Sequence, residues 1–294
     1  MHTDNKSTVS ETAFRSTLDD VHDDRKAGNL EKAARSYQSL HAIGPSKISV
    51  ESALWLADLA MVKGDILGLF EMNRNLTVLL EDHGPALQGE HFRLLGLTYF
   101  YLFDFNSAEN FFELANTKFI ESGLNDKIEL AETNSIELYA HLDPELSIRL
   151  AKNFIEHPLK SGTNIELGKI YTALGWAHIR TNEFSKAETC FESANIYYTQ
   201  SKYWLGKKRN AIAFGYLELL IGRESQGKQK IANSIDGLFK SSAYPSLILL
   251  GFSMLNGVDK GHDLRWAEAI ELLRLPKDID IQTNIDAFLQ GLMN

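Results

Sequence analysis

The segment "LGLTYFYLFDFNSAENFFELAN" at residues 95–116 returns as "LGWAHIRTNEFSKAETCFESAN" at residues 174–195. Leucine, glycine, phenylalanine, alanine, glutamate and asparagine recur at matching places, so that Gly96 corresponds to Gly175, 79 residues later. Self-similarity at a fixed offset is the signature of a repeat architecture. The segment therefore predicts a chain built from similar units arranged in a row.

Apolar residues in this segment are spaced three and four apart, as on one face of a helix. Ala108, Phe112, Ala115 and Phe119 follow this spacing. Sustained alternation of apolar and polar residues is absent, and no Asn-Gly or Asp-Gly turn joins β-branched runs. The prolines fall where a helix is expected to break. The sequence predicts an all-α protein.

We expect helices in pairs joined by short turns, with boundaries accurate to a few residues. Residues 1–13 are expected to form a flexible N-terminal tail, and residues 14–294 a single domain. The expected pairs are 14–26 with 30–43, 48–62 with 66–82, 88–103 with 106–122, 126–141 with 144–157, 165–180 with 184–200, 204–221 with 225–240, and 244–256 with 263–274, followed by a last helix near 279–291.

Each repeated residue type has a physical role. Gly96 and Gly175 let the two helices of a hairpin approach closely, because no Cβ stands between them. Phe112 and Phe191 fill the space between one hairpin and the next. A single hairpin cannot bury that apolar face alone, so successive hairpins must stack.

These residues resemble the tetratricopeptide pattern, a helical hairpin of 34 residues. The resemblance implies a right-handed superhelical solenoid of about seven hairpins with a C-terminal capping helix. The matching residues are Phe92, Leu95, Gly96, Tyr99, Ala108, Phe112 and Ala115 in residues 89–122, and Tyr171, Leu174, Gly175, Ala187, Phe191 and Ala194 in residues 168–201.

The offset between the two matches fits two repeats of about 39–40 residues, with a diverged unit at 128–161 between them. Residues 14–47 form a weaker match, and residues 50–83 depart from the pattern because Leu69 stands where a small residue is expected. Repeats of this length resemble the sensor domains of maltose-regulator-type activators and of Rap-type peptide receptors.

The resemblance also implies which residues face a concave groove, namely positions 2, 5, 9, 12 and 13 of each repeat. Aromatic residues and arginine, common at binding hot spots, occur among them. In the alternative interpretation they pack neighbouring first helices, or the C-terminal helix fills the groove. The expected partner-binding residues are Arg93, Leu97, Phe100, Tyr101, Glu132, Tyr139, Lys169, Thr172, Trp176, Arg180, Arg209 and Tyr216.

If these residues only contact a partner, alanine at Trp176 and at Arg180 should abolish partner binding and leave the melting temperature nearly unchanged. The partner is expected to be a protein or peptide segment. Solenoid edges also make a homodimer possible.

Composition limits the alternatives. The net charge of −9 argues against sequence-independent binding to nucleic acid and against docking on anionic lipid. The longest apolar run, residues 247–255, is too short to span a membrane. A single cysteine and a polar N-terminal stretch without an apolar core favour a cytoplasmic protein.

No catalytic set, cofactor site or metal site emerges from the sequence. "GRESQGKQ" (residues 222–229) resembles a phosphate-binding loop, but Gln229 replaces the required Ser or Thr, and a helical pattern precedes it instead of a strand. The histidines lack metal-ligand spacing.

Three hypotheses follow. The first is a non-enzymatic scaffold or sensor that grips a partner segment in its concave groove. The second is a regulatory subunit that controls a transcription factor or kinase and is tuned by a small peptide. The third, an enzyme on a helical frame, has the least support.

Overall fold

The computed structural model describes residues 5–43, 46–156, 163–256 and 264–293, and all regular structure within them is helical. The helices are α1 (Asn5–Ala27), α2 (Leu30–Ile43), α3 (Ser46–Lys63), α4 (Ile66–Leu80), α5 (Pro85–Tyr101), α6 (Phe105–Ser122), α7 (Asn125–Leu142), α8 (Pro144–Glu156), α9 (Asn164–Arg180), α10 (Phe184–Gln200), α11 (Trp204–Leu220), α12 (Glu224–Lys240), α13 (Pro245–Asn256), α14 (Leu264–Leu272) and α15 (Ile281–Met293).

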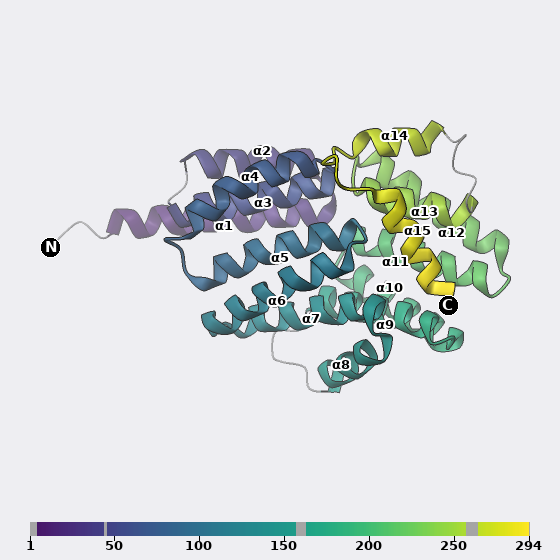
Figure 1. Ribbon diagram of the computed structural model, residues 1–294. Helices are drawn as coiled ribbons and strands as arrows, with labels where there is room; N and C mark the ends of the chain where they lie inside the picture. Colours follow the sequence, from purple (N-terminus) through teal and green to yellow (C-terminus); the bar gives the residue numbers. More distant parts are fainter. Residues whose placement is uncertain (1–4, 44–45, 157–162, 257–263, 294) are drawn as a thin grey trace.

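The all-α prediction is confirmed, and the paired arrangement is the expected one (Figure 1). Most helix ends lie within three residues of the expected positions. The first helix differs, because it begins at Asn5 and not near residue 14. Residues 257–263, between the two helices of the last pair, lie outside the described residues.

The two matching segments fold alike. A Cβ placed on Gly96 would overlap the ring of Phe112, and one placed on Gly175 would overlap the ring of Phe191. Phe191 is fully buried, as is Ala187, which lies one helical turn before it on α10. In both hairpins an aromatic ring of the second helix therefore lies against bare backbone of the first.

The turns inside these hairpins also match. Phe103 and Asn182 occupy corresponding positions and both adopt left-handed backbone angles, with φ of 59° and 58°. In the first hairpin Asp104 then caps α6 by accepting a hydrogen bond from the Ser107 amide at 3.1 Å. Gly222, between α11 and α12, also adopts left-handed backbone angles. The segment that resembled a phosphate-binding loop thus comprises the hairpin turn after α11 and the first residues of α12.

The odd-numbered helices form the inner side of the array. Each of α1, α3, α5, α7, α9 and α11 packs on the next odd-numbered helix. Even-numbered helices make no comparably close contact with one another within the described residues. A row whose units lie close on one side and apart on the other curves toward the close side, and we call that side the inner face.

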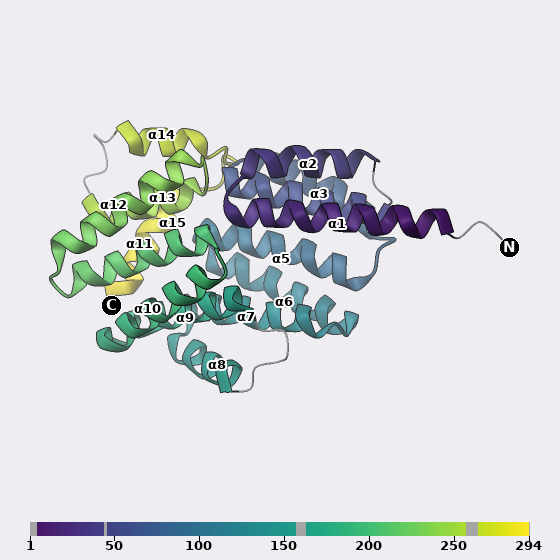
Figure 2. The same cartoon turned by 180° about the vertical axis from the view of Figure 1, so that it is seen from behind.

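The curvature brings the two ends of the row together (Figures 1 and 2). α1 packs against α11, and a Cβ on Gly28 would overlap the indole of Trp204. The Tyr244 amide donates to the Val62 carbonyl at 2.6 Å, before α13 begins. The C-terminal hairpins therefore lean on the N-terminal ones as well as on their neighbours in sequence.

We expect Gly175→Val to destabilise the fold by about 2–3 kcal/mol, because the new methyl groups need the space of the fully buried Phe191 ring. Urea unfolding followed by circular dichroism measures the change. Gly84→Ala is the matched control, since nothing lies within 4 Å of a Cβ there and its φ of −62° suits alanine. Equal stability of the two variants would contradict the packing role of Gly175.

Candidate binding surface on the inner helices

The inner face has two halves, of which one is covered by another helix and the other is open. In the half formed by α9, α11, α13 and the C-terminal ends of α5 and α7, the last helix lies across the wall and packs on α9 and α13 (Figure 1). In the half formed by α1, α3, α5 and the start of α7, a pocket of about 290 Å³ is open.

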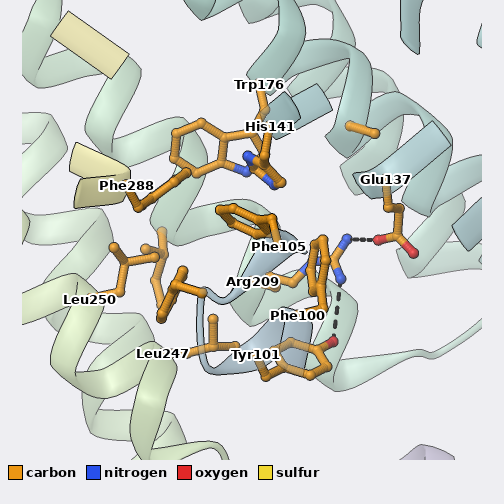
Figure 3. A pocket seen from close by; sticks show the side chains of 13 residues that line it. Phe100, Tyr101, Phe105, Glu137, His141, Trp176, Arg209, Leu247, Leu250 and Phe288 are labelled. Carbon is orange, nitrogen blue, oxygen red and sulfur yellow. Dashed lines mark hydrogen bonds and ion pairs between the residues drawn. The ribbon is translucent and has the colours of Figure 1, made fainter. Parts of the chain in front are cut away.

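Phe288 of α15 lies against the aromatic side chains of the covered half (Figure 3). Its ring centre lies 5.5 Å from that of Trp176 and 5.2 Å from that of His141. A cavity of about 40 Å³ remains beneath it, lined by side chains such as Phe100, Ile212 and Leu250. The aromatic residues expected to contact a partner in this half already have an intramolecular partner.

A buried ion pair forms the polar side of this cavity. Arg209 of α11 pairs with Glu137 of α7 and also donates to the Tyr101 hydroxyl at 3.3 Å (Figure 3). Burial by itself would lower the pKa of Arg209, but Glu137, Tyr101 and Tyr198 together outweigh burial, and the pKa is raised well above its ordinary value. The guanidinium is therefore a fixed structural charge.

His141 lies among these rings and is neutral at physiological pH. Burial lowers its pKa from 6.5 to about 3, with further lowering by Arg180 and Arg209. Its ring stacks on Phe105 at 4.7 Å, and its Nδ1 is buried without a hydrogen-bond partner among the described residues. Protonation would place a charge in an aromatic cluster.

The open pocket combines an apolar floor with charged walls. Leu54 and Leu94 lie at its base, and Trp55 forms one side, with the Arg25 guanidinium 5.0 Å from the centre of its ring. The pocket is lined by Arg15, His22, Lys47, Glu51, Leu54, Trp55, Asp58, Ala86, Leu87, Glu90, Arg93, Leu94, Leu124 and Lys127.

Each carboxylate of the pocket has a cationic partner. Burial raises the pKa of Glu90, but Arg93 and Lys127 outweigh burial and bring it to about 2. Lys47, by contrast, is exposed and forms no ion pair with a described carboxylate. The pairs are Arg15–Glu51, Arg25–Asp58, Arg93–Glu90 and Lys127–Glu90. The lining therefore carries more positive than negative charge, although the whole chain is acidic.

The expected partner-binding residues are divided between several environments. Arg93 lines the open pocket and Leu97 is half-buried in the core next to it. Glu132 is exposed, and Tyr139, Lys169 and Arg180 are half-buried. Thr172 is fully buried and bonded to Asn210 at 3.1 Å. The residues whose side chains face the covered half or its cavity are Phe100, Tyr101, Trp176, Arg209 and Tyr216.

Most residues of the open pocket are absent from the expected groove set, although the same positional rule leads to them. Positions 2 and 9 of the weak repeat 14–47 are Arg15 and His22, and positions 2, 5 and 9 of repeat 50–83 are Glu51, Leu54 and Asp58. The expected groove residues come from the two strong matches and from the weaker units after them, and none comes from the first two repeats. The weak repeats also indicate which residues face the groove. Groove positions depend on the geometry of the first helix, and not on the Gly, Ala and Phe residues of the repeat pattern.

One comparison with a solved structure, that of NprR, supports the fold. No protein-family model matches the chain, and no curated protein is similar to it in sequence. The crystal structure of NprR in complex with its cognate peptide NprX superimposes with a TM-score of 0.63 at 10% identity, covering 97% of this chain and 89% of NprR. BtubC (BKLC) from P. vanneervenii gives a TM-score of 0.45 at 18% identity, covering 74% and 91%. The fold is a tetratricopeptide-like solenoid.

No group of three or more potential metal ligands comes together in the described part of the chain. Within that part, none of the helices has the length and apolar character that crossing a membrane requires.

We expect Trp176→Ala to destabilise the protein by about 3–5 kcal/mol, because Trp176 is 7% exposed and contacts Phe288, His141 and Tyr216. This differs from the expectation of an unchanged melting temperature. Thermal unfolding monitored by circular dichroism measures it. Lys169→Ala, on the same helix, should stay within about 0.5 kcal/mol of the wild type. An unchanged melting temperature for Trp176→Ala would contradict a stabilising role for the contacts of the Trp176 ring.

We expect the free energy of unfolding to fall as the pH falls from 6.5 toward 3, because unfolded His141 takes up a proton that the folded state excludes. The neutral residue's contribution is complete above pH 6.5. Its loss amounts to about 1.4 kcal/mol per pH unit inside the window. In urea titrations at pH 6 and pH 5, His141→Phe should show a shallower pH dependence by this amount. Equal slopes would exclude His141 as the source.

Proposed function

We propose that the protein is a non-enzymatic binding module that holds a peptide or protein segment in the open half of its inner face. The observation that carries the proposal is the pocket of about 290 Å³ at the groove positions of the first repeats, with α15 covering only the other half. Four helices contribute side chains to it, so a segment bound there contacts several repeats at once.

The lining favours a segment with an apolar side chain next to a carboxylate. Leu54, Leu94 and Trp55 offer an apolar surface. Lys47, together with the second cation beside Glu90, supplies positive charge beyond what the acids of the pocket neutralise. Charge complementarity of this kind contributes more to selectivity and association rate than to affinity.

The comparison with NprR is consistent with this proposal. NprR was crystallised in complex with a cognate peptide, and its fold matches this chain over nearly the whole length. The proposal for the present protein nevertheless depends on its own pocket, because a similarity at 10% identity concerns the fold alone.

Regulation of a transcription factor or kinase by a small peptide is the second candidate. The long-repeat resemblance and the match to a peptide complex favour it. In this second candidate function, the bound peptide acts as the regulator, and the regulated transcription factor or kinase contacts another surface of the protein.

The test is selection of 12-residue peptides from a displayed random library on the immobilised full chain, followed by fluorescence anisotropy of the selected sequences. We expect acidic sequences with one large apolar residue. Lys47→Glu and Leu124→Ala should weaken their binding at least tenfold, and neither should change the melting temperature, since both side chains are exposed at the pocket rim.

Lys152→Glu on α8 is the matched charge reversal, at an outer position whose side chain is 74% exposed. It should leave peptide binding unchanged. Selected peptides that bind all variants equally would place the binding site elsewhere, and the absence of any enriched sequence would contradict the proposed function.

A further inference from the structure

α15 has the form of an amphipathic helix laid in a groove. Its buried residues are Ile281, Ile285, Phe288 and Leu292, which are spaced four, three and four apart. Such a stripe is how short helical ligands are recognised by hydrophobic grooves. Here the helix and its groove belong to one chain.

One residue of the stripe is set apart by its surroundings. Phe288 lies among the rings of Phe103, Phe105, His141 and Trp176, with ring centres between 5.2 and 5.9 Å away. We call these four rings the Phe288 cage. They come from the α5–α6 turn and from α6, α7 and α9, so a single side chain contacts three successive hairpins (Figure 3).

The groove is wider than the helix that occupies it. A hollow of about 300 Å³, bordered by Asn106, Arg180 and Gly291, runs along one side of α15. A second hollow of about 200 Å³, between Tyr99 and Thr283, lies nearer the start of α15 and shares Asp104 and Asn284 with the first. A permanent core helix is normally enclosed by close-packed neighbours.

The chain before α15 is attached separately. The Arg274 amide donates to the Gly64 carbonyl at 2.9 Å, and the Leu67 amide donates to the Arg274 carbonyl at 2.9 Å. α15 also begins with its own cap, since Asp280 accepts from the Gln282 and Thr283 amides. The helix can therefore leave the groove without releasing the segment at Arg274.

We propose that the groove under α15 is a helix-binding site, that α15 is its internal ligand, and that the partner helix it accepts is amphipathic with an aromatic side chain for the Phe288 cage. This partner displaces α15, which cannot remain helical alone at thirteen residues. The proposal is independent of the open pocket, because the two sites share no residue.

The test uses the full chain and a fluorescein-labelled peptide that reproduces residues 279–293. Tethered α15 competes at a high effective concentration, so the wild-type chain should bind the peptide weakly. A Phe288→Ala chain, whose own helix has lost its anchor, should bind it at least tenfold more tightly. A peptide carrying the same Phe288→Ala change should not bind either chain.

Gln290→Ala, on the exposed side of α15, is the matched control and should behave as the wild type in the chain and in the peptide. A folded Phe288→Ala chain that fails to bind the wild-type peptide overturns the proposal. So does equal binding to all chains, because it shows attachment outside the groove.

Hydrogen exchange of the unmodified protein provides a second measurement that needs no variant. We expect the α15 amides to exchange at least tenfold faster than those of α9, through openings that leave the rest of the array intact. Identical exchange rates for α15 and α9 would show that the helix is a permanent part of the core, and the proposal would fail.

Discussion

Two helices of a hairpin can lie as close as they do here only where one of them lacks a side chain. Gly96 and Gly175 leave bare backbone, and the rings of Phe112 and Phe191 occupy the space. That contact fixes the angle and separation within each hairpin. The remaining apolar surface must then be buried by the next hairpin, so the geometry of one contact, repeated, determines the curvature of the whole array.

Curvature in turn creates contacts that no single repeat contains. Tyr101 and Arg209 are 108 positions apart and meet through a hydrogen bond, while Arg209 also pairs with Glu137. A buried ion pair does little for net stability, but the loss of one partner is costly because the other charge is left unpaired. These pairs therefore favour the closed arrangement over alternatives in which the inner helices slide.

The helices were predictable from the sequence because their causes are local. The turn after α9 follows from the left-handed residue Asn182 and the spacing around it, and the same holds 79 residues earlier at Phe103. The occupancy of the inner face was not predictable in this way. Trp176 contacts Phe288 because α15 folds back over the inner face. The spacing of apolar residues along the chain does not predict where α15 packs. The open pocket, in contrast, could be predicted from the sequence, because Arg15 and Glu51 stand at groove position 2 of the first two repeats.

The two halves of the inner face differ in the groove residues that line them. The groove residues at the open pocket include Glu51, Asp58 and Arg93, each of which pairs with an oppositely charged neighbour. Those at the covered half include Phe100, Trp176 and Tyr216, whose contiguous exposure in water would be unfavourable. A contiguous apolar surface on the inner face must be buried by another helix, whereas a surface of paired charges can stay exposed to water. The same helical geometry thus produces a site that is open to a ligand and a site that the chain covers with its own last helix.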